Sequence, residues 1–460
     1  MLPGEAIKVR ILLMIKIAPA REVNSLDAVM RDRYGLPSEM LIEKASRLMY
    51  DDIRSLIEDK HTLFLVGKGN NGSDALSVAL FAKRDGLDVS VYYLSDSGCP
   101  ENMARRERVR EAGIPVVSDV EGFNCYVDGL IGAAFRLPLY EDVEKIIVKV
   151  NAIDALKISV DIPSGLLFRA DRTVVFTMHK KEAFKHGNRL SLGEYALYNP
   201  GFPERELLDF PTDSFLLEDS DYSIEPFRGS DYKNSRGHVA ILGGSERYSG
   251  AAILSARSAF HAGAGLVTIF TSEKAYPALS SYRPAMVRKD PFEEKGIKAL
   301  IVGPGWNDEG NRDFVSSRLP MVIDADGLNY LEAGDRFGYR AVITPHVGEF
   351  RRLCSRFGIE EDTVKLSRLL ETVVVLKAET VEITDGKTSY FYDGMNPSLG
   401  VAGSGDVLSG IIGAFLSCGI SPLDAAINGV ILHQKAGKVA HEKYGYYDTV
   451  DLTDVMGRLR

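Results

Sequence analysis

The segment "NPSLGVAGSGDVLSG" at residues 396–410 places an acid directly after a run of glycine and other small residues. Beyond Asp406, apolar residues recur at helical spacing: Val407, Leu408, Ile411, Ile412 and Phe415. The letters "AGSGD" are therefore expected to form a helix N-terminus, whose free backbone N–H groups suit an anion. Gly403 and Gly405 would let the backbone approach a phosphate closely.

Asp406 lies beside this expected anion cradle and need not contact the phosphate itself. A carboxylate there is placed to take the proton from a hydroxyl that attacks a phosphate, as a base in phosphoryl transfer. The structural alternative is a helix N-cap within a glycine turn. The chain has no GxxxxGK[ST] segment, so a P-loop enzyme is disfavoured.

Other polar or turn-forming segments of the same half follow apolar runs: "GPG" at 303–305, "DADGLN" at 324–329, "TPHVGEF" at 344–350 and "LKAET" at 376–380. His346 follows such a run and precedes a glycine, so exposure at a sheet edge is expected. Lys377, Glu379 and Thr380 are candidates for contacts with nucleotide phosphate and ribose groups.

A second glycine-rich segment, "GKGNNG" at 67–72, matches the GxGxxG pattern between an apolar run and a helical pattern. That arrangement is typical of dinucleotide-binding domains. Asp74 argues against this interpretation, because a carboxylate in the first helical turn would repel a pyrophosphate bound there. Two amides and an acid suit hydroxyls, a cation or a positively charged ring.

Three oxygen-bearing residues, Asn71, Asp128 and Ser164, follow neighbouring apolar runs. Amide, carboxylate and hydroxyl oxygens are ligands that hard cations accept. Each residue taken alone also suits a helix cap or a turn. Their concentration at expected strand ends favours a functional interpretation.

The elements that must position these residues are apolar runs that alternate with helical patterns. They lie at 62–67, 88–95, 125–132 and 158–165, and then at 238–245, 265–272, 299–305, 321–327, 341–346 and 373–384. The alternation predicts an α/β protein with doubly wound parallel sheets, in which ligands bind at the carboxyl ends of the strands. The polar, acidic stretch 209–237 is expected to join two domains, residues 1–217 and 218–460.

The chain has 460 residues, a net charge of −9 and a sequence pI of about 5.6, which disfavours nucleic acid as a partner. Its four cysteines form no CxxC pair, so we expect reduced thiols and a cytoplasmic protein. The apolar segment "VRILLMIKIA" is short and contains Lys16, so a signal peptide is not expected, and Met14 is an alternative start. No run approaches the length of a membrane span.

Several motifs together carry a resemblance to a known family. "GNNGSD", "VDGLIGAAF" and "VDIPSGL" resemble the epimerase domain of NAD(P)HX repair proteins. The dehydratase domain of the same proteins, a divergent ribokinase-like domain, is resembled by "GAAILSARSAFHAGAGLV", "VGPG", "IDADGLN", "TPHVGEFRRL", "LKAETVEI" and "AGSGDVLSGIIGAFL". The resemblance covers nearly the whole chain, in the order of the fused bifunctional enzyme.

This resemblance implies a Rossmann-like epimerase domain followed by a ribokinase-like dehydratase domain. The substrates would be nicotinamide cofactors hydrated at C6 of the ring. The first domain would interconvert the R and S hydrates. The second would dehydrate the S form with ADP or ATP as phosphate donor and Mg²⁺ on the nucleotide. The implied partners are these small molecules, with a homo-oligomer expected and neither nucleic acid nor membrane.

The resemblance also implies roles for individual residues. The epimerase pocket would be lined by Asn70, Asn71, Gly72, Ser73, Asp74, Gly132, Ala133, Ala134, Phe135, Arg136, Leu137, Pro138 and a catalytic Asp161. Potassium would bind Asn71, Asp128 and Ser164. The hydrate to be dehydrated would contact Ala251, Gly305, His346 and the catalytic base Asp406. The nucleotide would contact Lys377, Ala378, Glu379, Thr380, Val381 and Gly405.

The chain departs from the family pattern at a few loop positions. Ser73 and Ala75 stand where the epimerase loop usually has glycine, and Ala378 and Ala402 replace common glycines of the dehydratase. Ala378 and Ala402 are expected to be tolerated if the local φ is negative. The main alternative is a ribokinase-like sugar or vitamin kinase with a non-catalytic N-terminal binding domain. A Rossmann dehydrogenase is disfavoured by Asp74.

Overall fold

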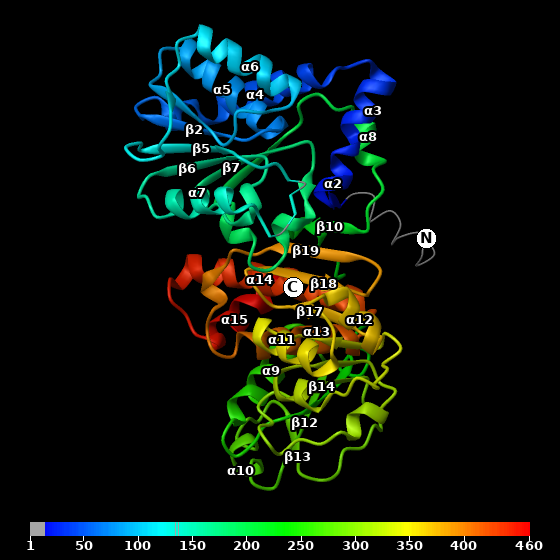
Figure 1. Ribbon diagram of the computed structural model, residues 1–460. Helices are drawn as coiled ribbons and strands as arrows, with labels where there is room; N and C mark the ends of the chain where they lie inside the picture. The colour runs from blue at the N-terminus through cyan, green and yellow to red at the C-terminus, as the bar shows by residue number, and fades with distance from the viewer. Residues whose placement is uncertain (1–13, 134, 137) are drawn as a thin grey trace. The chain divides into compact units, whose positions relative to one another are not determined.

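The computed structural model describes residues 14–133, 135–136 and 138–460. The first part of the apolar N-terminal segment, with residues 1–13, lies outside the described range, as do Ala134 and Leu137. The chain folds into two compact α/β units (Figure 1). The N-terminal unit is Lys16–Thr212, and the C-terminal unit is Asp213–Arg460 together with the described residues Met14 and Ile15.

The N-terminal unit is built on a sheet with the strand order β4-β3-β2-β5-β6-β7-β9, in which every neighbouring pair is parallel. The short strands β1 and β8 pair with each other in parallel and are not part of this seven-stranded sheet. The strands are β1 (Ile15–Ala18), β2 (Thr62–Val66), β3 (Val89–Tyr93), β4 (Val116–Val117), β5 (Cys125–Gly129), β6 (Leu156–Val160), β7 (Arg172–Phe176), β8 (His179–Lys180) and β9 (Glu194–Tyr198). The helices are α2 (Ala20–Val23), α3 (Ser25–Tyr34), α4 (Ser38–Ile57), α5 (Asn70–Arg84), α6 (Pro100–Glu111), α7 (Glu141–Asn151) and α8 (Glu204–Leu208).

Helices cover both faces of this sheet, with α4, α5 and α6 on one side and α7 on the other (Figure 1). Successive side chains of a strand point to opposite faces. In β2, Phe64 and Val66 pack in the core beneath α4 and α5, whereas Leu63 and Leu65 pack with α7. All four are fully buried, which explains why the strand has a continuous apolar sequence.

The C-terminal unit is built on a mixed sheet with the order β13-β12-β11-β14-β15-β16-β17-β18-β19-β10. Its strands are β10 (Ser214–Leu217), β11 (His238–Leu242), β12 (Leu266–Phe270), β13 (Met286–Arg288), β14 (Ala299–Val302), β15 (Met321–Ile323), β16 (Ala341–Ile343), β17 (Val373–Leu376), β18 (Thr380–Thr384) and β19 (Ser389–Asp393). Its helices are α9 (Ser249–His261), α10 (Tyr276–Leu279), α11 (Val347–Phe357), α12 (Thr363–Leu370), α13 (Ser404–Ser417), α14 (Pro422–Tyr444) and α15 (Thr449–Leu459).

Here too the strand residues alternate between two cores. Val239 and Ile241 of β11 pack with α9, α13, α14 and α15, whereas Ala240 and Leu242 pack on the side of α11 and α12. The prediction of an α/β protein with parallel sheets covered by helices is confirmed. The run 373–384, taken as one apolar segment, forms two antiparallel strands, β17 and β18, joined by a turn at residues 377–379.

The boundary predicted from the sequence lies after Leu217, whereas the compact units divide between Thr212 and Asp213. Strand β10 accounts for the difference, because its residues pair in parallel with β19 inside the C-terminal unit. Within the described residues, no helix is both long and apolar enough to cross a membrane.

Candidate active sites

Helix α13 begins at Ser404, so the glycine-rich segment forms a helix N-terminus as predicted. Gly403 is its N-cap and has a φ of 89°, a conformation that glycine adopts without steric cost. A Cβ at this position would also lie 2.5 Å from a methyl group of Leu254. The sequence therefore needs a glycine here to turn the chain into the helix, which brings Asp406 into the first turn.

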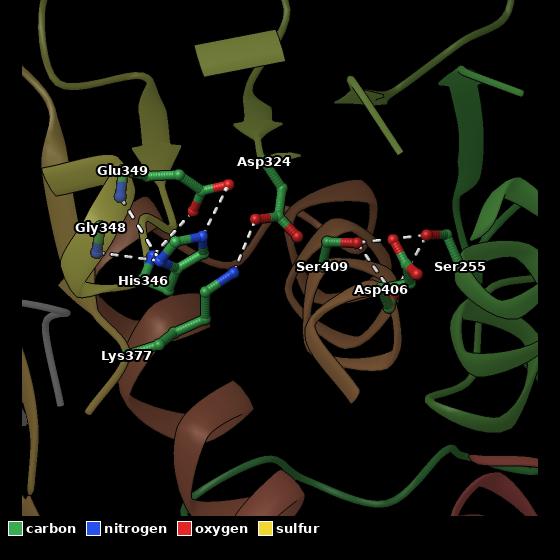
Figure 2. Close-up of polar contacts among 8 residues, drawn as sticks. All are labelled: Ser255, Asp324, His346, Gly348, Glu349, Lys377, Asp406 and Ser409. Atoms are coloured by element: carbon green, nitrogen blue, oxygen red, sulfur yellow. Dashed lines mark hydrogen bonds and ion pairs between the residues drawn. The ribbon is translucent and has the colours of Figure 1, made fainter. Parts of the chain in front are cut away.

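Asp406 is anchored through its backbone, and its side chain remains available for chemistry. The hydroxyls of Ser255 on α9 and Ser409 on α13 donate hydrogen bonds to the Asp406 carbonyl, at 3.1 and 2.9 Å (Figure 2). Burial raises the pKa of the Asp406 carboxyl to about 7, with a further contribution from the negative charge of Asp324 and opposition from Lys377. A base with this pKa is half ionised near neutral pH, where proton abstraction is most efficient.

The Lys377 ammonium forms an ion pair with the buried carboxylate of Asp324 at 2.8 Å (Figure 2). Asp324 follows β15, and Lys377 follows β17. A Cβ on Gly405 would lie 3.2 Å from the Lys377 nitrogen and 3.8 Å from an Asp324 oxygen. The ion pair thus lies against the N-terminus of α13, so a phosphate held by that helix would meet a lysine as well.

His346 and Glu349 cap the start of α11 reciprocally, as Figure 2 shows. The His346 Nδ1 accepts hydrogen bonds from the backbone N–H groups of Gly348 and Glu349, at 3.0 and 3.4 Å. Because Nδ1 is the acceptor, the ring proton of the neutral imidazole lies on Nε2, which is 3.5 Å from the Glu349 carboxylate. Burial raises the pKa of Glu349, and the nearby Lys377 opposes that rise. The His346 backbone pairs with that of Lys377, so these residues adjoin the ion pair.

Ala251 and Gly305 are brought together. Gly305 has a φ of 67°, and a Cβ there would lie 3.0 Å from the Ala251 methyl group and 2.2 Å from the Tyr248 carbonyl oxygen. Ala251 lies one turn before Ser255 on α9, the helix that contacts Asp406. Ala251 therefore lies on the helix that contacts Asp406, Gly305 lies against Ala251, and His346 adjoins Lys377.

The nucleotide residues Lys377, Ala378, Glu379, Thr380 and Val381 occupy the turn between β17 and β18 and the start of β18. The buried Thr380 hydroxyl makes no hydrogen bond to any described group. The backbone φ of Ala378 and of Ala402 is not positive, so the methyl groups that replace glycine cause no backbone strain.

His433 is a residue of this site that the sequence did not reveal. It lies on α14, and its Nε2 is 3.1 Å from the Ser404 hydroxyl at the start of α13. Burial lowers the pKa of His433 to about 4, with a smaller contribution from Lys377, so the ring is neutral. A histidine inside the long helix α14, which also contains His441, offers no local signal for such a contact.

The N-terminal unit contains a cavity of about 960 Å³. Of the residues predicted to form the epimerase pocket, those that line it are Asn70, Asn71, Asp74, Gly132, Ala133, Phe135 and Asp161. Gly72, Ser73, Arg136 and Pro138 are not among its lining residues. Ala134 and Leu137 lie outside the described residues. Most of the predicted pocket residues that line the cavity therefore come from the start of α5 and from the segment after β5.

Asp161 follows β6 with a φ of 63°, an uncommon conformation for a residue other than glycine. Its carboxylate accepts a hydrogen bond from the Phe176 N–H at 3.0 Å and pairs with the ammonium of Lys180. Lys180 is almost fully buried and also donates to the Phe176 carbonyl at 2.7 Å. Lys180 lies on the two-residue strand β8 and was not predicted, because only the fold brings it to Asp161.

Asp74 is a buried residue of the cavity lining, and the Ser46 hydroxyl donates a hydrogen bond to its carboxyl at 3.1 Å. Burial raises its pKa well above the usual range, and the charges of Asp161 and Asp27 add to the rise. The group is therefore more easily protonated than an ordinary carboxylate. Ser73 and Ala75 lie beside it within α5, and neither backbone has a positive φ, so the loop accepts these residues without strain.

The three predicted cation ligands are connected by hydrogen bonds through Ile131, which lines the cavity together with Asn71. Asp128 is fully buried and accepts hydrogen bonds from the Ser164 hydroxyl at 2.6 Å and from the Ser164 N–H at 2.8 Å. The Ile131 N–H donates to the Ser164 hydroxyl at 2.9 Å, and the Asn71 amide donates to the Ile131 carbonyl at 3.3 Å. Burial raises the pKa of Asp128 to about 6, against the lowering effect of these hydrogen bonds.

Comparison with known proteins connects both units to one family. A sequence profile described as NAD(P)H-hydrate dehydratase matches residues 239–458, and one described as YjeF-related protein N-terminus matches residues 38–181. The bifunctional NAD(P)H-hydrate repair enzyme of Escherichia coli is 32% identical over 90% of this chain and 87% of its own length. The enzyme of the same name from Thermofilum pendens is 30% identical over 94% of this chain and 93% of its own length.

Among solved structures, the ADP/ATP-dependent NAD(P)H-hydrate dehydratase of Bacillus subtilis matches with a TM-score of 0.46 and 24% identity, over 53% of this chain and 96% of that chain. The two profiles account for most of the sequence, in the order that a fused enzyme requires. The identity to the two repair enzymes extends over nine-tenths of the chain. The chain therefore belongs to the family of bifunctional NAD(P)H-hydrate repair enzymes.

Proposed function

We propose that the protein repairs hydrated nicotinamide cofactors. The N-terminal unit interconverts the R and S forms of NAD(P)HX, and the C-terminal unit dehydrates the S form to NAD(P)H with ADP, releasing AMP and phosphate. The observation that carries the proposal is the position of Asp406, a carboxyl with a pKa of about 7 in the first turn of α13 beside the Lys377–Asp324 pair. A base, a helix N-terminus and a lysine are the groups that phosphoryl transfer to a hydroxyl requires.

In the dehydratase reaction, Asp406 takes the proton of the C6 hydroxyl, and the hydroxyl oxygen attacks the terminal phosphate of ADP. The bond from that phosphorus to the bridging oxygen breaks, and AMP leaves. The lone pair of the ring nitrogen then expels phosphate from C6, and loss of a C5 proton restores the dihydropyridine. Lys377 and the N-terminus of α13 stabilise the charge on the transferring group.

In this proposal the hydrate contacts Ala251, Gly305 and His346, and the nucleotide contacts the segment 377–381 and Gly405. Mg²⁺ bound to the nucleotide phosphates would supply charge neutralisation. A cation suits this site, because Asp324 and Asp326 both add negative charge to the surroundings of Asp406. The Bacillus subtilis dehydratase named above was co-crystallised with ATP and Mg²⁺.

In the epimerase reaction, Asp161 exchanges a proton with the C6 hydroxyl or with the water that replaces it, and Lys180 holds the carboxylate in place. Potassium would be held by Asp128, Ser164 and Asn71. The donor set fits this ion, because the hydrogen-bond partners of the buried Asp128 carboxylate are all neutral groups. A bound cation would balance its charge and order the segment around Ile131.

The same proposal makes the enzyme a cytoplasmic homo-oligomer that acts on small molecules. Cys99, Cys125, Cys354 and Cys418 are all free thiols, which suits a reducing compartment. Sedimentation of the purified full-length chain would establish the number of subunits.

The test is to supply a mixture of R and S NADHX with ADP, and separately with ATP, and to follow NADH at 340 nm. The proposal predicts complete conversion, faster with ADP. Recovery of only the S half would contradict the epimerase assignment. A phosphorylated product without NADH would favour the alternative of a small-molecule kinase.

A further inference from the structure

The cavity of the N-terminal unit holds a further accessible carboxyl group, that of Asp27, besides the carboxyl of Asp161. Asp27, on α3, lines the cavity together with Asp161 and Lys180. Among the residues that the structure describes, no group donates a hydrogen bond to the Asp27 carboxyl. This carboxyl is half-buried, unlike the exposed acid Asp32 on the same helix, which pairs with Arg31.

Asp27 faces charged groups from several elements around the cavity. Lys180 and Asp161 both act on it electrostatically, and so does Arg31 from its own helix. Further charged residues of the cavity lining are Lys68, Asp74 and Asp142. Asp74 also interacts with Asp27, but it lies deeper and accepts the hydrogen bond from Ser46.

Asp161 and Asp27 have different surroundings. Asp161 pairs with the Lys180 ammonium and accepts a hydrogen bond from the Phe176 N–H. Asp27 has neither kind of partner, and burial raises its pKa, with Asp161 adding to the rise and Lys180 opposing it. Asp161 is paired with an ammonium, and Asp27 accepts no hydrogen bond from any described group. Two carboxyls of one cavity that differ in this way suit acid–base work in which one gives a proton while the other takes one.

We propose that Asp27 is a second catalytic residue of the epimerase, which exchanges a proton with the C6 oxygen on the ring face opposite the one served by Asp161. This inference rests on the proposed epimerase function of the cavity. It assigns the two sides of the reaction to two different carboxyls, one from α3 and one from the end of β6.

Asp27, protonated, gives its proton to the C6 hydroxyl, the C6–O bond breaks, and water leaves while the ring-nitrogen lone pair forms a C6=N bond. Asp161 takes a proton from a water molecule on the other face, whose oxygen bonds to C6 as the C=N pair returns to nitrogen. The product is the opposite epimer, Asp27 is ionised, and Asp161 is protonated. Proton exchange with solvent in the cavity resets both groups, and the reverse reaction exchanges their roles.

The test compares Asp27→Asn with the control Asp32→Asn in the full-length enzyme. Interconversion of R and S NADHX is followed by chromatography, and dehydration of pure S-NADHX serves as an internal check on folding. We expect Asp27→Asn to slow epimerisation by about 100-fold or more, the usual contribution of a positioned acid, with dehydration unchanged. Asp32→Asn should behave like the wild-type enzyme.

Two further readouts separate proton transfer from a structural effect. The wild-type epimerase should lose activity at high pH, because Asp27 ionises there. This loss of activity at high pH should be absent in Asp27→Asn. Formate or acetate should restore part of the activity of Asp27→Ala in a concentration-dependent manner. Asp27→Asn within threefold of the wild-type rate would overturn the proposal. The proposal would also be overturned if Asp27→Asn epimerised slowly but still lost activity at high pH, and if neither formate nor acetate restored activity to Asp27→Ala. A wild-type enzyme that does not interconvert the epimers would overturn the proposed epimerase function itself.

Discussion

The carboxyl groups of this protein differ in what surrounds them, and those surroundings assign their chemistry. Burial raises the pKa of the Asp406 carboxyl to about 7, and the negative charge of Asp324 adds more to this rise than the positive charge of Lys377 removes. Asp161 is paired with the Lys180 ammonium, and Asp128 accepts only neutral hydrogen-bond donors. The sequence pointed to Asp128 and Asp161 at the ends of apolar runs, and to Asp406 directly after a glycine-rich segment. It did not identify Lys180, Asp27 or His433, which reach their sites through tertiary packing.

The pKa of Asp406 predicts how the rate of dehydration depends on pH. Asp406 must be ionised to act as a base, so kcat/KM for S-NADHX should rise with pH through about 7. Lys377→Gln removes the positive charge that lowers the pKa of Asp406, so the rise in kcat/KM should move to higher pH. Asp324→Asn removes a negative charge that raises it and should move the limb to lower pH. Shifts in the same direction for both variants would contradict the assignment of this limb to Asp406.

A second prediction concerns potassium. Folding raises the pKa of Asp128 from 3.8 to about 6. Between these two values the folded chain keeps a proton that the unfolded chain has already released. The N-terminal unit therefore loses stability as the pH rises from about 4 to about 6. A cation bound to the ionised carboxylate should offset the loss. Above pH 7, KCl should therefore raise the Tm of this unit relative to tetramethylammonium chloride at equal ionic strength.

Asp128→Asn should abolish that potassium effect, and Asp59→Asn, which alters an exposed carboxylate of the same unit, should preserve it. An equal rise in Tm for the wild-type enzyme and Asp128→Asn would exclude Asp128 as a ligand.

At the scale of elements, the strands were predictable because residues of both sheet faces are buried, which gives continuous apolar runs. The antiparallel turn between β17 and β18 was not, since "LKAET" contains neither glycine nor proline to mark it. Its position matters, because it brings Lys377 beside the start of α13. The left-handed conformation of Asp161 also has no local sequence signal, since aspartate more often adopts ordinary angles.

The start of α13 provides the prediction at this scale. Gly403→Ala would force a residue with a Cβ to a φ of 89° and within 2.5 Å of Leu254. It should destabilise the C-terminal unit by about 1 kcal/mol or more and weaken dehydration by displacing Asp406. Gly334→Ala is the matched control, since that glycine has open space around it and no positive φ. The urea midpoint of the C-terminal unit checks both, and equal midpoints would contradict the strain argument.

For the whole molecule, each unit has its own hydrophobic core and contains one of the two carboxyls that we propose as catalytic, Asp161 or Asp406. The order of the two family profiles along the chain matches a reaction sequence in which epimerisation supplies the hydrate that dehydration consumes. The two-domain organisation was predictable from the alternation of apolar and helical segments. The exact extent of the units was not, because the short apolar strand β10 lies within an otherwise polar junction and carries no signal of which sheet it joins.

The most direct test of this account is complementation with R-NADHX and ADP, monitored as NADH at 340 nm. Asp161→Asn should dehydrate S-NADHX normally but fail on R-NADHX beyond its uncatalysed epimerisation. Asp406→Asn should interconvert the epimers but form no NADH. The account predicts that a mixture of the two variants converts R-NADHX to NADH, although neither variant does so alone. Normal conversion of R-NADHX by Asp406→Asn alone, or no conversion by the mixture, would contradict it.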